Sequence, residues 1–267
     1  RLSDKSLTKA IDAIREDGYI VLHDVIEKAK IETLRDRMLA DVEKILALDA
    51  VPYQFKKGHI QQDPPPFKPF LYQDVLVNPF VIDVTHALLG DGVKNAFYSG
   101  NCCLPGSQSQ PVHFDMGHLW PNYHPAHAIV VNVPVINMNR ENGSTELWPQ
   151  SHLNTAKSKI TGDIKVPDEI VESQRKKSRP FQPEMPAGSI LLRDIRLWHR
   201  GMPNKTDKPR PMIAMIHYPC WYQTSQSVKL EKGSEEIVKD KRLTTVAEFV
   251  KDPINYISHN KNYDYCE

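Results

Sequence analysis

Three side chains that suit metal binding lie close together in the stretch QPVHFDMGHLWP, residues 110–121, namely His113, Asp115 and His118. A β-strand directs residues i and i+2 to the same side. A strand at QPVHFD would therefore aim the His113 imidazole and the Asp115 carboxylate into one space. Taken alone, the pair predicts little, because a chain with 11 histidines contains such triplets by chance. A surface or capping pair is the simpler interpretation at this point.

A third candidate ligand, His199, changes that balance. It lies in DIRLWHRG, directly after the apolar strand pattern of AGSILLRD. In a jelly roll, strands that are distant in sequence become neighbours, so His199 can complete a face with His113 and Asp115. Two imidazoles and one carboxylate on one face are the ligand set of the non-haem Fe(II) oxygenases, which keep other positions open for co-substrate and dioxygen.

Arg210 follows His199 after a turn-rich connection, MPNKTDKP. We expect it to open the next strand and to point inward beside the metal site. A guanidinium there can bind a carboxylate through two parallel hydrogen bonds. For an isolated arginine, pairing with a surface acid is the commoner role.

Three blocks in this order and spacing resemble the phytanoyl-CoA dioxygenase family of Fe(II)/2-oxoglutarate oxygenases. They are QPVHFD, ENGSTELWPQSH and AGSILLRDIRLWHRGMPNKTDKPR, and the similarity covers roughly residues 95–220. No single block is specific, but the combination is. The residues before about 90 carry no motif that matches the family.

The resemblance implies roles for individual residues. His113, Asp115 and His199 match the iron ligands, and Arg210 matches the arginine that binds the distal carboxylate of 2-oxoglutarate. Gln110 stands where several members hold the co-substrate, and Thr145 is a weaker candidate for the same task. The implied cofactors are Fe(II), 2-oxoglutarate as co-substrate, and O2, with release of succinate and CO2.

The chain departs from the family pattern at two places. The family often has Ser two residues after the last histidine ligand, where this chain has Gly201, and often has Trp where this chain has Asn132. These changes bear on co-substrate contacts and on the substrate, and not on the iron ligands. Because Asp115 is retained, the halogenase variation, in which chloride replaces the carboxylate, is disfavoured.

Candidate substrate residues come from the loop after Asp115 and from aromatic side chains. His118 lies past Gly117 and is expected in a loop, where binding residues concentrate. Tyr72, Met116, Trp120 and Trp221, together with Phe70, could line an apolar pocket, although aromatic residues are core residues more often than pocket residues. His124 and His127 are expected to be structural, and His152 in PQSH to hydrogen-bond within the core.

Composition excludes several classes of partner. The 267 residues carry a net charge of +1, which gives no footprint for nucleic acid or for a lipid surface. Apolar runs such as AIVVNVPVI are too short to cross a bilayer. No signal-peptide pattern opens the printed sequence, which begins at Arg1. The four cysteines form no CxxC pair, so reduced thiols in a cytoplasmic protein are expected.

The pattern along the chain favours one oxygenase domain over residues 1–267, mainly β with flanking helices around a double-stranded β-helix, the cupin-like jelly roll. Residues 1–92 read as mostly helical support, with helices near 7–17, 28–48 and 78–89 and a strand at 19–26. Short β-rich runs punctuated by Gly, Pro and Asn predict the jelly-roll core at 93–222. A polar surface insertion at 156–180, with a helix at 167–177, interrupts the core, and 223–267 form a C-terminal extension.

The predicted function is the hydroxylation of an unactivated C–H bond in a small organic molecule of secondary metabolism by a non-haem Fe(II)/2-oxoglutarate dioxygenase. Desaturation, epoxidation and ring formation use the same ligands, so the sequence does not choose among them. The alternatives are a non-catalytic jelly-roll binding protein, a zinc hydrolase with the same ligands, and an oxygenase acting on a peptide. The substrate-selecting loops are expected at 52–76, 116–127 and 156–180. The sequence leaves the oligomeric state open.

Overall fold

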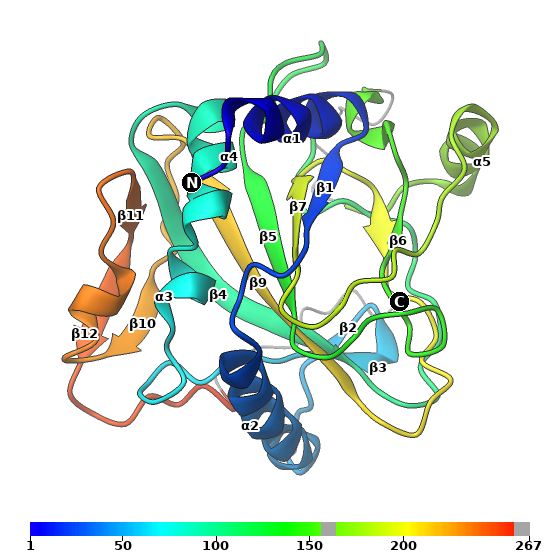
Figure 1. Ribbon diagram of the computed structural model, residues 1–267. Coiled ribbons are helices and arrows are strands. Elements are labelled where there is room, and N and C mark those ends of the chain that lie inside the picture. The colour runs from blue at the N-terminus through cyan, green and yellow to red at the C-terminus, as the bar shows by residue number, and fades with distance from the viewer. Residues whose placement is uncertain (156–163, 259–267) are drawn as a thin grey trace.

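The larger layer of the protein is an eight-stranded, mostly antiparallel sheet. The computed structural model describes residues 1–155 and 164–258. Strand order is β1-β7-β5-β9-β4-β3-β2, and β11 pairs in parallel with β4 (Figure 1). The strands are β1 (Tyr19–Leu22), β2 (Tyr53–Gln54), β3 (Lys56–Gln61), β4 (Val93–Cys103), β5 (Ile129–Pro134), β7 (Ile190–Asp194), β9 (Arg210–Tyr218) and β11 (Leu243–Thr245).

A smaller layer faces this sheet. Its centre is the antiparallel pair of β6 (Glu146–Leu147) and β8 (His199–Arg200). Isolated bridges extend the pair on both sides, joining Leu147 to Phe181, and His113 to both His199 and Lys165. Two facing antiparallel layers built from sequence-distant strands form the expected jelly roll.

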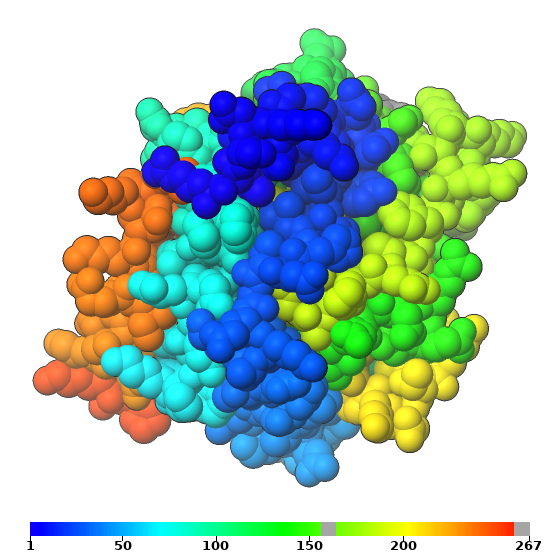
Figure 2. All heavy atoms as spheres, viewed as in Figure 1, coloured from blue at the N-terminus to red at the C-terminus, as the bar shows by residue number. Residues whose placement is uncertain are grey.

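Helices cover the outer face of the large sheet. They are α1 (Asp4–Glu16), α2 (Lys28–Leu46), α3 (Gln73–Leu76) and α4 (Pro79–Leu89). In Figure 1 α1 crosses the upper end of the sheet, α3 and α4 lie in front of β4, and α2 lies at the lower end, and in Figure 2 blue and cyan atoms cover the middle of this face. Ser3 caps α1 by accepting a hydrogen bond from the Ser6 amide, and Asn78 caps α4 through the Phe80 and Val81 amides. The expected helices at 7–17, 28–48 and 78–89 are confirmed.

Successive side chains of the central strands point to opposite faces of the large sheet, one toward the hydrophobic core and the other toward the smaller layer. In β5, Ile129, Val131 and Val133 pack against the helices in the main hydrophobic core. Val130 and Asn132 point to the opposite face, toward the smaller layer, where they line a cavity. Because both faces are covered, every residue of β5 is buried, which explains the unbroken apolar run in the sequence.

The remaining elements extend the edges of the fold. α5 (Asp168–Lys177) confirms the helix expected at 167–177. The parallel pair of β10 (Val228–Glu231) and β12 (Ala247–Val250) belongs to the C-terminal extension, and short 3-10 helices lie at η1 (Ser151–Leu153) and η2 (Glu235–Val238). Residues 156–163 of the expected insertion, and 259–267 with Cys266, lie outside the described residues. Among the described residues, no helix is long and apolar enough to cross a membrane.

Two local expectations were wrong. Part of the loop expected at 52–76 is the β2–β3 hairpin, which joins the edge of the large sheet by pairing with β4. The strand expected at QPVHFD is reduced to bridges at His113, and Asp115 lies in a bend. Neither change separates His113 from Asp115 in space, because the short backbone path between them still directs both side chains inward.

Candidate metal centre

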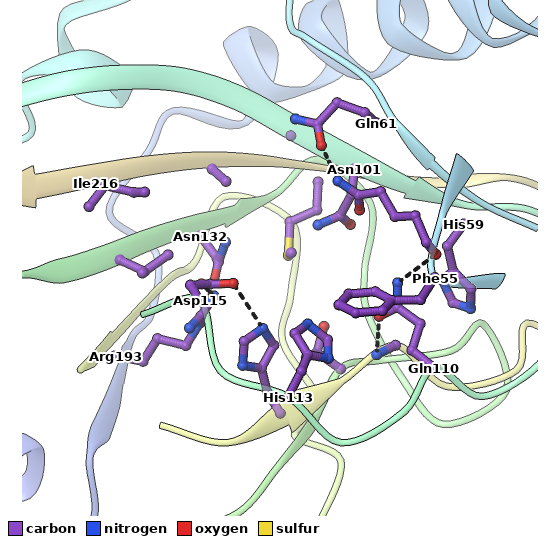
Figure 3. Close-up of a pocket in the computed structure, with 18 of the residues that line it drawn as sticks. Phe55, His59, Gln61, Asn101, Gln110, His113, Asp115, Asn132, Arg193 and Ile216 are labelled. Carbon is purple, nitrogen blue, oxygen red and sulfur yellow. Dashed lines mark hydrogen bonds and ion pairs between the residues drawn. The ribbon is translucent and has the colours of Figure 1, made fainter. Parts of the chain in front are cut away.

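Three side chains converge between the two layers. His113, Asp115 and His199 each offer one ligand atom, and these atoms all lie within 4.8 Å of one another. The Nε2 atom of His199 is 3.5 Å from Oδ1 of Asp115 (Figure 3). The imidazole rings of His113 and His199 are 4.4 Å apart between centroids. Three of the expected residues are therefore brought together, although 84 positions separate Asp115 from His199 in the sequence.

Backbone contacts orient both imidazoles. The His113 amide donates to the His199 carbonyl at 3.0 Å, and the His199 amide donates back at 2.8 Å. Each ring also forms a hydrogen bond between Nδ1 and the carbonyl two residues earlier. The distance is 2.9 Å from His113 to Pro111 and 3.0 Å from His199 to Leu197. A neutral imidazole whose Nδ1–H donates to a carbonyl presents the Nε2 lone pair, which is the usual arrangement of a histidine that binds a metal.

The protonation states also suit a cation. Burial lowers the pKa of His113, and lowers the pKa of His199 well below its ordinary value, so both rings are neutral at pH 7. Burial alone would raise the pKa of Asp115, but the adjacent Arg193 guanidinium holds it well below its usual range. Two neutral nitrogens and one carboxylate oxygen are the donor set that Fe(II) accepts, so the residues present fit this metal.

Arg193 is a site residue that sequence reasoning missed. Its Nη2 lies 2.5 Å from Oδ2 of Asp115, and its Nε donates to Oδ1 of Asn132 at 3.1 Å. The carboxylate therefore faces His199 with one oxygen and Arg193 with the other. The available signal was a charged side chain that follows the apolar residues ILL in a strand pattern, because a buried strand does not carry such a residue without a partner.

The ligands open onto a cavity of about 270 Å³ enclosed by the two layers. Arg210 reaches it from the start of β9 and is 2% exposed, with its Nε bonded to the Asn142 carbonyl at 3.2 Å. Gln110 and Thr145 line the same cavity. A buried guanidinium beside a candidate metal centre provides what a bidentate carboxylate ligand needs.

The departure at position 201 has a steric reason. A Cβ at Gly201 would lie 2.6 Å from Cε1 of His59 and 2.8 Å from Oε1 of Gln110. The Gln110 side chain accepts from the Gly201 amide at 2.8 Å and donates to the Gln54 carbonyl at 3.3 Å. His59 is fixed in turn by a 2.6 Å contact of Nε2 with the Gln108 carbonyl. The β2–β3 hairpin therefore fills the space that a serine at 201 would occupy.

The β2–β3 hairpin supplies further cavity residues that the sequence did not indicate. Phe55 packs its ring 4.3 Å from the His113 ring and adopts a φ of +58°. A bulky residue in this left-handed region is strained, and such strain is common next to functional sites. His59 and Gln61 also line the cavity from this hairpin.

The expected substrate residues lie apart from the described lining of this cavity. Trp120 and Trp221 are 48% and 56% exposed. Tyr72 precedes α3 on the helical side, as does Phe70. Met116 accepts a hydrogen bond from the Tyr222 hydroxyl, and His118 stacks edge-on against His124. Substrate contact by these side chains stays a prediction. His152 bonds to the Arg15 carbonyl at 3.0 Å, in keeping with a structural role.

Comparison with known families agrees with this geometry. Residues 14–212 match the phytanoyl-CoA dioxygenase (PhyH) family. The chain belongs to this family. The expected family is therefore confirmed. A curated relative, dioxygenase af480 of Aspergillus fumigatus, is 28% identical over 196 residues. That alignment covers 70% of this chain, which spans 60% of the relative's length.

Solved structures show that this PhyH chain shares their fold. The epimerase SnoN in complex with Fe3+, alpha ketoglutarate and nogalamycin RO superposes with a TM-score of 0.64 at 15% identity, over 94% of this chain and 98% of SnoN. EctD from S. alaskensis, solved with 2-oxoglutarate and 5-hydroxyectoine, superposes with a TM-score of 0.58 at 20% identity. The match covers 82% of this chain and 76% of EctD. The jelly-roll expectation is thereby confirmed.

Proposed function

We propose that this protein uses Fe(II), 2-oxoglutarate and O2 to oxidise an unactivated C–H bond of a small organic molecule, in the simplest case by hydroxylation, with release of succinate and CO2. The observation that supports this most strongly is the meeting of His113, Asp115 and His199 in one cavity with the buried Arg210. A zinc hydrolase would need the three ligands but would give Arg210 no task.

Each residue has a proposed task. His113 and His199 hold the metal through Nε2, and their Nδ1 contacts with carbonyls keep the rings in that orientation. Asp115 supplies the third donor atom and stays ionised beside Arg193. Bound iron supplies the activation of dioxygen and the oxidation of the co-substrate. Arg210 binds the distal carboxylate of 2-oxoglutarate, with Gln110 and Thr145 lining the same cavity.

The protein also controls what reaches the metal. The two imidazoles and Arg210 are buried, and the cavity walls on β5 and β9 include Val130, Ala214 and Ile216. Such walls exclude bulk water and place a carbon skeleton beside the metal, which is what selective C–H oxidation requires. The cavity size supports a free small molecule as substrate.

The wider setting is part of the same proposal. Residues 1–267 act as one oxygenase domain. SnoN is described as an enzyme of nogalamycin biosynthesis, which makes a role in secondary metabolism a reasonable extension to this chain. Free thiols at Cys102, Cys103 and Cys220 support a cytoplasmic location.

Coupled oxygen chemistry tests the proposal. Protein reconstituted with Fe(II) is incubated with 2-oxoglutarate in air, and O2 uptake and succinate are measured together. We expect both in equal amounts, even at the low rate that occurs without substrate, and neither in His199→Ala. Full activity of a chelated, zinc-loaded sample on hydrolysable substrates, without succinate, would favour the hydrolase instead.

A further inference from the structure

We propose that the substrate of this enzyme carries one negative charge, as a carboxylate, and that Arg193 is the group that selects it. The inference rests on the proposed function, because it counts the charges of Fe(II) and of 2-oxoglutarate. It adds a substrate class and a specificity-determining residue that the metal ligands and Arg210 do not supply.

Arg193 has an unused hydrogen-bonding group beside the metal centre. Its side chain is 5% exposed and lines the cavity. Nη2 and Nε are taken by Asp115 and Asn132, but Nη1 is buried without a hydrogen-bond partner among the described residues. Leaving a charged donor unsatisfied costs more than leaving a neutral one, so such a group in a site points to a ligand that supplies the acceptor.

The charges in the cavity are also unbalanced. Among the described residues that line it, the one carboxylate is Asp115 and the two guanidiniums are Arg193 and Arg210. With Fe(II) bound, the metal and the two guanidiniums bring four positive charges. Asp115 and doubly ionised 2-oxoglutarate bring three negative charges. Without Arg193 the loaded site would be neutral, so Arg193 leaves one positive charge in excess. Because an uncompensated buried charge is costly, a substrate with one negative charge would stabilise the loaded site by neutralising it.

Strand register places an apolar surface directly beside this charge. Val130 on β5 pairs with Arg193 on β7 on one side and with Ile216 on β9 on the other. In this register the three side chains form a row across the inner face of the large sheet, and all three line the cavity. Figure 3 shows Arg193 and Ile216 at the two ends of this row. A carboxylate at Arg193 would lay its hydrocarbon chain along Val130 and Ile216.

Three probes with one carbon skeleton test the charge directly. Hexanoate, hexanamide and hexylamine carry a negative, a neutral and a positive head group. Their binding to protein loaded anaerobically with Fe(II) and saturating 2-oxoglutarate is measured by isothermal titration calorimetry. We expect hexanoate to bind at least about tenfold more tightly than hexanamide, as for a charge-assisted pair, and hexylamine not to bind.

Variants assign that preference to one residue. Arg193→Met should bring the affinities of hexanoate and hexanamide close together, while Arg193→Lys, which keeps the charge, should retain part of the difference. Arg200→Gln is the matched control, because Arg200 pairs with Glu146 at 2.7 Å and is not part of the described cavity lining. It should leave the preference unchanged.

Several results would overturn the inference. They are equal binding of hexanoate and hexanamide by the wild type, failure of all three probes to bind, an unchanged preference in Arg193→Met, or competition of hexanoate with 2-oxoglutarate, which would place the anion at Arg210. The visible charge-transfer band of the Fe(II)–2-oxoglutarate chelate is recorded in each sample. A present band with any of these results refutes only the substrate charge, whereas a missing band refutes the proposed function with it.

Discussion

In the part of the chain that the structure describes, two regions are rich in histidine, and one of them, the metal centre, has the geometry to hold a metal. In the metal centre, each imidazole has Nδ1 on a carbonyl and aims Nε2 at a shared space beside Asp115. The second region, which we call the histidine cluster, consists of His118, His124 and His127.

The histidine cluster differs from the metal centre in the contacts of its ring nitrogens and in the state of its nearest carboxylate. His118 and His127 have no hydrogen-bond partner on either nitrogen among the described residues. His124 uses both of its nitrogens on the backbone, accepting from the Leu119 amide at Nε2 and contacting the Pro125 carbonyl through Nδ1, so neither nitrogen is left for a metal. The nearby carboxylate of Asp194 is already bound to Arg196, through contacts of 2.8 Å and 2.6 Å. The comparison shows that a metal site requires anchored rings and an available carboxylate, and that closeness of imidazoles is not sufficient.

The largest predicted difference between the two regions concerns iron. His199→Ala removes one of three donors, so we expect loss of Fe(II) binding at equimolar metal and no iron-dependent succinate formation. His127→Phe should bind Fe(II) as the wild type does. Iron content after anaerobic reconstitution and desalting checks both variants. Equal loss of iron in the two would mean that the histidine cluster takes part in metal binding.

A smaller effect is expected at the co-substrate. Arg210→Ala removes a buried charge-assisted partner worth about 1.5–3 kcal/mol, which corresponds to a roughly tenfold to hundredfold rise in the 2-oxoglutarate requirement. Iron binding should be retained, because Arg210 does not touch the three ligands in the contacts observed. Succinate formation against 2-oxoglutarate concentration measures the change. An unaltered requirement would show that another group binds the distal carboxylate.

The lack of space for a side chain at Gly201 should be measurable as a loss in the free energy of unfolding. Gly201→Ala places a Cβ against His59 and Gln110, and overpacking of this kind costs about 1–3 kcal/mol. In a His59→Ala background the same substitution should cost less, because the nearest contact is gone. Urea unfolding of the four proteins gives the coupling free energy. Additive effects would place the two side chains outside mutual contact.

A further expected effect concerns the acid stability of the histidine cluster. Burial lowers the pKa of His118 and His127 to about 4, against roughly 6.5 in the unfolded chain. Neutral rings therefore contribute their full stability above pH 6.5, and it is lost as the pH falls toward 4. Each histidine contributes up to about 1.4 kcal/mol per pH unit.

Substitution separates that contribution from general acid unfolding. His127→Gln should flatten the pH dependence of the free energy of unfolding between pH 6.5 and 4, whereas His23→Gln, at an exposed position, should not. Urea midpoints across this range provide the comparison. An identical slope in wild type and His127→Gln would contradict the assignment.

The sequence could predict the parts of the protein that depend on local patterns or on motifs in a fixed order along the chain. Helix periodicity predicted α2 and α4, and apolar runs with turn residues predicted the central strands. The spacing of three blocks assigned the family, and the structure brings the expected His113, Asp115, His199 and Arg210 to one cavity. That these residues bind iron and co-substrate stays a prediction until they are tested.

What sequence could not predict depends on strand register and on long-range packing. Arg193 faces the metal centre because β7 is in register with β5, which puts every second residue on the inner side. The β2–β3 hairpin lies within the segment 52–76 that was expected to be a loop, yet pairing with β4 makes it a wall of the cavity. The meaning of Gly201 also depends on His59, which lies 142 positions earlier in the chain.

The most direct test of the central claim is an anaerobic titration of Fe(II)-loaded protein with 2-oxoglutarate, followed by visible absorption. If His113, Asp115 and His199 hold iron with room for a bidentate co-substrate, a weak charge-transfer band appears and saturates at one equivalent, and His199→Ala shows none. A wild-type sample that demonstrably binds iron yet develops no band would contradict the account.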